Sequence, residues 1–140
     1  MVGSGISTLI IYRGINMAKP YGKELILDLH NCDPNTFTRE SIENYLSKLC
    51  KLIKMEGEDL HFWDYLYDDK EYQKAPDHLK GTTVVQFLKT SNVTIHTLDV
   101  LEKVFVNIFS CKDFDRMKAQ RFTESWFKGE TVQWKLINRL

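Results

Sequence analysis

The chain has no excess of charge of either sign and no long hydrophobic run. Its 140 residues include 19 Lys+Arg and 19 Asp+Glu, so the formal net charge is zero at pH 7. A neutral chain has no electrostatic surplus to attract a polyphosphate backbone or an anionic membrane, so neither nucleic acid nor a membrane is predicted as a partner. The apolar run from Leu9 to Tyr12 is far too short to span a bilayer.

Cysteines are few and form no CxxC pair. The three present are Cys32, Cys50 and Cys111. An odd, unpaired set is typical of reduced thiols, so we expect a cytoplasmic protein without a disulfide framework. The histidines and cysteines also lack the spacing of a recognised ligand set, so no metal site is predicted. Hydrophobic residues make up 43% of the chain, which is enough for one soluble globular domain to bury a core without disulfides or metal ions.

A second methionine, Met17, precedes the first strongly patterned segment. Residues 1–16 lack the basic start and the longer apolar region of a signal peptide. We expect these residues to be a disordered extension or an upstream start. Residues 17–140 are then expected to form a single domain.

Hydrophobic periodicity predicts an α+β fold with the element order β-α-β-β-β-β-α-β. Alternating or β-branched runs predict strands at 24–30, 60–66, 82–89, 93–98, 103–110 and 131–138. Apolar residues at three- and four-residue steps predict a helix over 39–54, capped by Thr38 and ended by Gly57. Asp113 and Asp115 can cap a second helix that runs to about Phe127, and the polar segment 67–80 is expected to be a loop.

This element order predicts a two-layer sandwich. Both helices would cover one face of a mainly antiparallel sheet. The other face then needs a cover, and the simplest is a second copy of the chain.

One stretch of sequence points to chemistry. Ser91 alone would be an ordinary turn residue between two strands. It lies, however, in TSNVTIHT at 90–97, which follows GTT at 81–83 and precedes IFSC at 108–111. Together these segments resemble the core of bacterial-type S-adenosylmethionine decarboxylase proenzymes, in which a histidine follows the serine by five residues and a cysteine follows it by twenty. The resemblance covers most of residues 21–140.

The resemblance implies that the protein makes its own cofactor. Ser91 would attack the carbonyl of Thr90, and β-elimination from the resulting ester would leave a pyruvoyl group at residue 91. A β chain would end at Thr90, and an α chain would span 91–140. The implied acid/base of processing is His96, and the implied hydrogen-bond donor is Thr83, where the family commonly has serine. The predicted hairpin places the Thr83 strand beside the His96 strand.

The resemblance also implies a decarboxylation. The pyruvoyl ketone would form a Schiff base with a small-molecule substrate and accept the electrons left when carbon dioxide departs, so no pyridoxal phosphate and no metal are expected. Cys111 matches the family's catalytic cysteine, the proton donor to the substrate carbon. The expected product is decarboxylated S-adenosylmethionine, the aminopropyl donor for spermidine. The expected assembly is a homodimer of cleaved αβ pairs.

The chain departs from the family pattern around the substrate. Thr90 and Asn92 replace the glutamate and histidine that commonly flank the serine, and HTLDV at 96–100 replaces HTWPE. The ribose-binding glutamate therefore falls on Val100, and the adenine-stacking aromatic falls on Asp77. The substrate-binding set predicted here comprises Phe62, Trp63, Asp64, Asp77 and Asp99. Its aromatics could stack on a purine or meet a sulfonium, and its carboxylates could hold a guanidinium or an ammonium.

Two alternatives stay open. A pyruvoyl-dependent decarboxylase could act instead on ornithine or arginine, with the distal cation met by Asp64, Asp68, Asp69 or Asp77. Alternatively, Thr90 and Asn92 are compatible with an unprocessed paralogue that only binds a ligand or regulates a partner. A purely structural module would account for the fold but not for the serine, histidine and cysteine together.

Overall fold

The computed structural model describes residues 19–140, and the expectation for residues 1–16 lies outside them. The elements are β1 (Gly22–His30), α2 (Arg39–Leu52), β2 (Gly57–Trp63), α3 (Asp69–Lys74), β3 (Gly81–Leu88), β4 (Ser91–Leu98), β5 (Lys103–Ser110), α4 (Arg116–Phe127) and β6 (Glu130–Arg139). Short 3-10 turns lie at Pro34–Thr36 and Asp77–Leu79. The predicted α+β class and order of strands and main helices are confirmed, with the short helix α3 added. Within 19–140, no helix has the length and hydrophobicity to cross a membrane.

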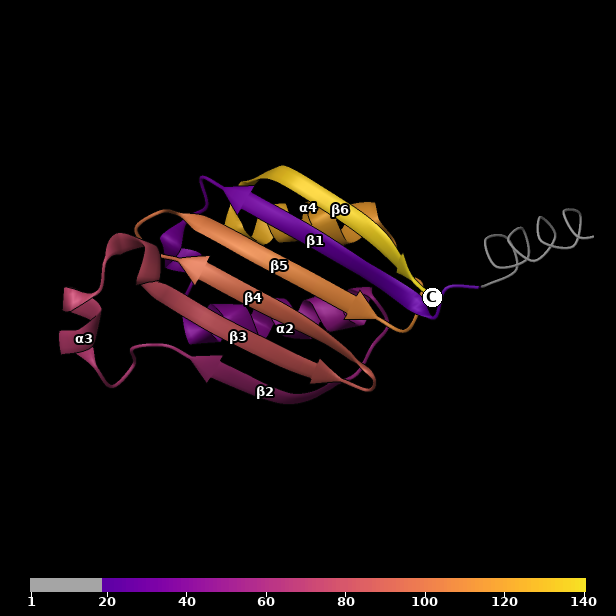
Figure 1. Cartoon of the computed structure of the whole chain (residues 1–140), viewed down its shortest axis with the longest axis horizontal. Coiled ribbons are helices and arrows are strands. Elements are labelled where there is room, and N and C mark those ends of the chain that lie inside the picture. The colour runs from indigo at the N-terminus through magenta and orange to yellow at the C-terminus, as the bar shows by residue number, and fades with distance from the viewer. Residues whose placement is uncertain (1–18) are drawn as a thin grey trace, which may run out of the picture.

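The six strands form one antiparallel sheet in the order β2-β3-β4-β5-β1-β6. Both α2 and α4 lie on the same face of this sheet (Figure 1). Strand alternation explains the two layers, because successive side chains of a strand point to opposite faces. In β5, for example, Val104, Val106 and Ile108 are fully buried under the helices, whereas Phe105 and Asn107 are only partly buried. The predicted two-layer sandwich is therefore confirmed.

Helix α2 begins as predicted and ends earlier than predicted. The Thr38 hydroxyl accepts a hydrogen bond from the Ser41 amide at 3.2 Å, which caps the first turn. The helix stops at Leu52 because Lys54 adopts a left-handed conformation with φ of 59°. The expectation that Gly57 ends the helix is wrong, since Lys54 makes the turn and Gly57 begins β2.

The segment 67–80, which we expected to be a loop, contains the short helix α3. The Asp68 carboxylate accepts a hydrogen bond from the Glu71 amide at 3.1 Å and so caps α3. In α4 the cap is Asp115, which accepts from the Lys118 amide at 3.1 Å. Asp113, the other predicted cap, forms an ion pair with Lys23 instead.

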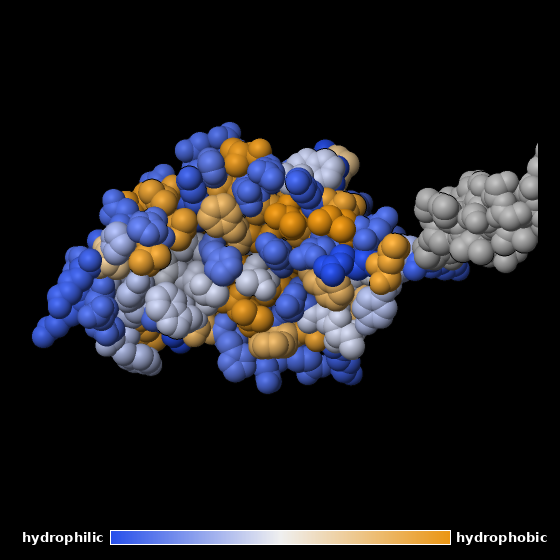
Figure 2. Space-filling model, in the orientation of Figure 1, coloured by the Kyte–Doolittle hydropathy of each residue, from blue (hydrophilic) through white to orange (hydrophobic). Residues whose placement is uncertain are grey.

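The sheet face opposite the helices, here called the open face, is not covered by any part of residues 19–140 (Figure 1). Cross-strand pairing arranges its side chains in rows. The His96 row contains Trp63, Thr83, His96, Phe105 and Asp28; the central row contains His61, Val85, Thr94, Asn107 and Ile26; the Asn92 row contains Phe87, Asn92, Phe109 and Glu24. Figure 2 looks onto this face and shows hydrophobic and aromatic side chains mixed with polar ones.

Candidate active site

The turn between β3 and β4 places strain next to Ser91. Because Leu88 pairs with Ser91, only Lys89 and Thr90 form this turn. Thr90 adopts a left-handed conformation with φ of 50°. A β-branched residue rarely adopts positive φ, and such a residue stores about 1–3 kcal/mol of strain. The strained residue is thus the one on the amino side of the peptide bond predicted to be cut.

Ser91 and Cys111 meet although twenty residues separate them. The chain reverses after β4 and returns along β5, so the end of β5 lies beside the start of β4. The Cys111 amide donates a hydrogen bond to Ser91 Oγ at 2.9 Å, and Ser91 is only 8% exposed. The Cys111 thiol points at the carbonyl oxygen of Lys89, 3.8 Å away. Side-chain hydrogen bonds with Ser91 and Thr90 hold the pKa of the Cys111 thiol below its ordinary value.

Ser110, which the sequence analysis did not single out, fixes the backbone around Cys111. Its side chain is fully buried at the end of β5. Ser110 Oγ donates to the carbonyl oxygen of Lys112 at 2.9 Å and accepts from the Lys112 amide at 3.0 Å. These two bonds fold the chain back at Cys111. The sequence signal for this role was the place of Ser110 in the alternating set of Val104, Val106 and Ile108.

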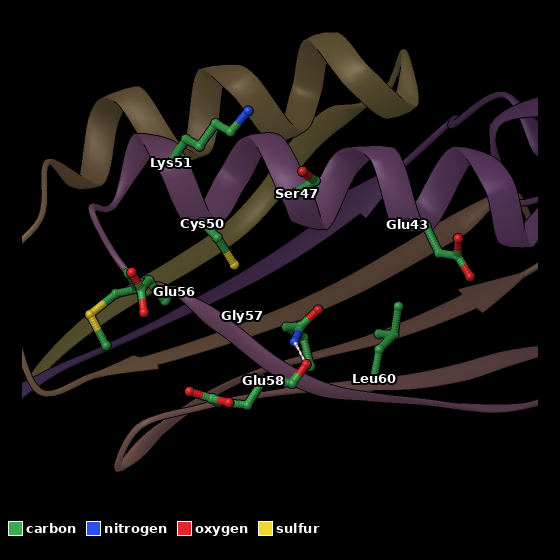
Figure 3. A pocket seen from close by; sticks show the side chains of 10 residues that line it. Glu43, Ser47, Cys50, Lys51, Glu56, Gly57, Glu58 and Leu60 are labelled. Atoms are coloured by element: carbon green, nitrogen blue, oxygen red, sulfur yellow. Dashed lines mark hydrogen bonds between the residues drawn. The ribbon is translucent and has the colours of Figure 1, made fainter.

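A hollow of about 380 Å³ opens beside Cys111. Its lining consists of Lys54, Met55, Glu56, Lys89, Thr90, Cys111 and Lys112. A further cavity of about 590 Å³ lies between α2 and β2 and shares Met55 and Glu56 with this hollow (Figure 3). At its floor the buried Gln86 amide donates to the carbonyl oxygens of Glu58 and Asp59, which holds the irregular start of β2.

His96 and Thr83 meet on the open face, as the hairpin prediction required. The two residues are direct cross-strand partners in β4 and β3. Thr83 Oγ1 and His96 Nδ1 share a hydrogen bond of 3.0 Å. His96 also lines a pocket of about 190 Å³ together with Trp63, Tyr65 and His78.

The structure does not bring His96 to Ser91 within one chain. Five residues of β4 separate the two, which corresponds to about 17 Å along an extended strand. Their odd spacing also places them on opposite faces. Ser91 belongs to the buried set of β4 under the helices, whereas His96 is exposed on the open face.

The predicted substrate-binding residues fall into three places. Trp63 lies in the pocket beside His96. Asp64 receives two hydrogen bonds from Arg39, at 2.7 and 2.9 Å, and this contact holds the pKa of Asp64 below its usual value. The Arg39 guanidinium also lies 5.1 Å from the Phe62 ring centre. Asp77 begins a 3-10 turn and lines neither of the two pockets at this end of the sheet.

Asp99 lies in the second of these pockets, which measures about 410 Å³ and includes Asp64 and Asp69. The Tyr72 hydroxyl of α3 donates to Asp99 at 2.9 Å. Burial raises the pKa of Asp99. Within residues 19–140, no group of three or more His, Cys, Asp or Glu side chains could hold a metal ion.

The fold and these contacts define an α+β protein in which a serine and a cysteine meet beside a strained turn at the edge of a two-layer sandwich. The family model of S-adenosylmethionine decarboxylase matches residues 23–140, so the chain belongs to that family of pyruvoyl-dependent lyases. The crystal structure of the adenosylmethionine decarboxylase from Aquifex aeolicus VF5 is similar, with a TM-score of 0.69 and 19% identity over 87% of this chain and 92% of that chain. That likeness shows a shared fold. Comparison with curated proteins gives no match.

Proposed function

We propose that the protein is a self-processing, pyruvoyl-dependent decarboxylase that converts S-adenosylmethionine to decarboxylated S-adenosylmethionine for spermidine synthesis. The observation that carries the proposal is the hydrogen bond between Ser91 and Cys111 beside the left-handed Thr90. Family membership supports the same chemistry. The strained turn, the hydroxyl and the thiol are the three parts that the chemistry needs in one place.

Self-cleavage would proceed in two stages. Ser91 Oγ attacks the carbonyl carbon of Thr90; a C–O bond forms, the amide C–N bond breaks, and the hydroxyl proton passes to the nitrogen of residue 91. A base then removes the Cα proton of residue 91, the Cβ–Oγ bond breaks, and Thr90 leaves as a carboxylate. Water hydrolyses the resulting dehydroalanine to a pyruvoyl group and ammonia. Breaking the backbone at Thr90 releases its left-handed strain, which favours the first stage.

Ser91 and its neighbours fit a pyruvoyl group at this position. The residue is nearly buried, its Oγ is held by the Cys111 amide, and the hollow beside it leaves room for a ligand. The group would supply an electron sink for the carbanion that decarboxylation creates. The Cys111 thiol would hold the proton that this carbon receives.

His96 would act on Ser91 of a second chain. In the proposed dimer, a second copy stacks on the open face with its strands reversed, and the central rows of the two copies face each other. The His96 row of one chain then lies over the Asn92 row of the other. Asn92 is the chain neighbour of Ser91, so each His96 would lie over the residue that follows the partner's cleavage bond. Two such contacts would form in a two-fold dimer, as in the proposed homodimer of cleaved αβ pairs.

Intact mass spectrometry under denaturing conditions tests the proposal. Cleavage before Ser91 would give about 10.6 and 5.9 kDa when 16.5 kDa is divided by length. The smaller species should carry a ketone-reactive terminus, and Ser91→Ala should give one intact species. A single full-length species that persists in the unmodified protein would sink the cofactor chemistry and favour the unprocessed paralogue.

A second candidate keeps the chemistry and changes the substrate to ornithine or arginine. The observation that favours it is the pocket at the His96 end that contains Asp69 and Asp99, since carboxylates outside the Arg39–Asp64 ion pair could meet a distal cation. A substrate panel decides between the two. Carbon dioxide released from ornithine or arginine, but not from S-adenosylmethionine, would replace the first choice with the second.

A further inference from the structure

The hollow beside Cys111 is rich in lysine. Its charged lining residues are Lys54, Lys89 and Lys112, with Glu56 as the one carboxylate. The full chain has equal numbers of acidic and basic residues, so a local set of three cations and one anion is a marked concentration. The hollow therefore has a positive potential at the point where a substrate would approach residue 91.

The ammonium groups of these lysines are available to a ligand. The ion pairs within residues 19–140 involve Lys23, Arg39, Lys128 and Arg139, and none involves a lysine of the hollow. Lys112 Nζ donates one long hydrogen bond, 3.4 Å, to the carbonyl oxygen of Lys54. A lysine has three N–H donors, so two remain free. The Ser110 side chain fixes the Lys112 backbone, which in turn keeps this lysine beside Cys111.

We propose that Lys89 and Lys112, supported by Lys54, bind the α-carboxylate of the substrate; this inference rests on the proposed function. In an α-amino acid the carboxyl carbon is two bonds from the amine nitrogen. An amine that reaches residue 91 therefore brings the carboxylate to the rim of the hollow, where Cys111 contacts Ser91. Ammonium groups are suitable partners for a carboxylate. The site serves any α-amino acid substrate, whichever side chain the other pocket accepts.

A pair of alkylating probes tests the site without any need for activity. Iodoacetate and iodoacetamide form the same C–S bond with the Cys111 thiolate and release iodide, but only iodoacetate carries a carboxylate. Peptide mass spectrometry measures the rate of iodoacetate divided by the rate of iodoacetamide at Cys111. We expect this ratio to fall about threefold to tenfold in the Lys89→Gln/Lys112→Gln variant. Salt should lower the ratio in the unmodified protein as well, because the attraction is screened.

Lys70→Gln/Lys74→Gln is the matched control, since it removes the same two charges from α3 at the other end of the sheet (Figure 1). The iodoacetamide rate corrects for any change in the accessibility or acidity of the thiol. An equal ratio in the double variant and in the unmodified protein would overturn the inference. The probes react with intact or cleaved chains, so this outcome is independent of whether the chain processes itself.

Kinetics of the processed enzyme provide the second readout. The double variant should show a KM raised about tenfold, and kcat should stay the same or rise, since the lysines hold the charged carboxylate more strongly than the transition state in which it becomes neutral carbon dioxide. Inhibition by the corresponding decarboxylated amine, which lacks the carboxylate, should be unchanged. Normal cleavage with an unchanged KM in the double variant would contradict the lysine site alone, whereas absent cleavage of the unmodified protein would contradict the proposed function.

Discussion

The two ends of β4 have opposite characters. At the Ser91 end the chain turns through a strained residue, the reactive hydroxyl is nearly buried, and lysines line the adjacent hollow. At the His96 end the imidazole lies on the open face, and the neighbouring pockets contain aromatic rings and carboxylates. Ser91 and His96 therefore do not meet within one chain. In the proposed dimer, each end of β4 would face the opposite end of β4 in the other copy.

Producing two inactive variants together is the strongest test of a site shared between Ser91 of one chain and His96 of another. Ser91→Ala and His96→Ala should each remain uncleaved when produced alone. When the two are produced together, a mixed dimer has one complete pair of Ser91 and His96, so about half of the His96→Ala chains should be cleaved. Intact mass spectrometry distinguishes the species.

The control for this experiment is a mixture of His96→Ala with a second His96→Ala preparation carrying a different tag. No cleavage should occur there. Cleavage of His96→Ala produced alone would show that His96 has no part in processing, and an uncleaved mixture of the two variants would contradict the shared site.

Changing Cys111 separates processing from decarboxylation. Cys111→Ser keeps the backbone amide that bonds to Ser91, so we expect cleavage to proceed. Decarboxylation should fall about 10²–10⁴-fold, because the thiol that would protonate the product carbon is lost. Mass spectrometry and carbon dioxide release measure the two effects on one sample. Equal loss of both would assign Cys111 to processing.

The acidity of the Cys111 thiol provides a pH test of the contacts at the Ser91 end of β4. Hydrogen bonds with Ser91 and Thr90 lower the pKa of the thiol, so the thiolate persists to lower pH than in an ordinary cysteine. In the uncleaved His96→Ala variant, which keeps both hydroxyls, the rate of alkylation by iodoacetamide should therefore reach half of its maximum below the usual pKa of cysteine. Thr90→Val removes one of these bonds and should move that midpoint upward. A midpoint unchanged by Thr90→Val would exclude this contact as a cause.

Relief of strain at Thr90 is a smaller effect. In an uncleavable Ser91→Ala background, Thr90→Gly should raise the free energy of unfolding by about 1 kcal/mol, because glycine adopts positive φ without steric cost. Lys89→Gly is the matched control in the same turn, and it should give no gain. Urea unfolding measures both. With Ser91 restored, Thr90→Gly should also slow cleavage, since the strain that favours the first stage is gone.

The smallest expected effect comes from Asp99, at the His96 end of β4, and it concerns the pH dependence of the free energy of unfolding. Its pKa is raised by burial, so folding favours the protonated form. The contribution of Asp99 to stability is therefore largest below the ordinary carboxyl pKa and is lost as pH rises through the raised value. As pH rises from the ordinary carboxyl pKa to the raised value, the free energy of unfolding of the unmodified protein should fall relative to that of Asp99→Asn. Parallel pH dependences of the two proteins would contradict a raised pKa.

The strands could be predicted well because their signal is local. The alternating runs predicted all six strands, and the short segments between the runs at 82–89, 93–98 and 103–110 predicted the hairpins. The end of α2 was missed because Lys54, and not a glycine, adopts the left-handed conformation there. Helix α3 was missed because Pro76 lies close by and the Asp68 cap stabilises only six residues.

The site was predictable in part. The family resemblance connected Ser91 with Cys111, and the predicted strand pairing connected Thr83 with His96. The lysine hollow was beyond the sequence patterns, because its residues come from the end of α2, the β3–β4 turn and the end of β5. Only the packed structure brings these three segments together.

The strand order has a consequence for the cleaved protein. A cut between Thr90 and Ser91 would leave β1, β2 and β3 in one chain and β4, β5 and β6 in the other, yet β1 lies between β5 and β6 in the sheet. The two chains would thus be interlocked, with three ladders joining them. They could not dissociate without unfolding, and reassembly would become bimolecular. Maturation would thus replace one chain, which can refold after it unfolds, with a two-chain complex that is lost once its chains separate.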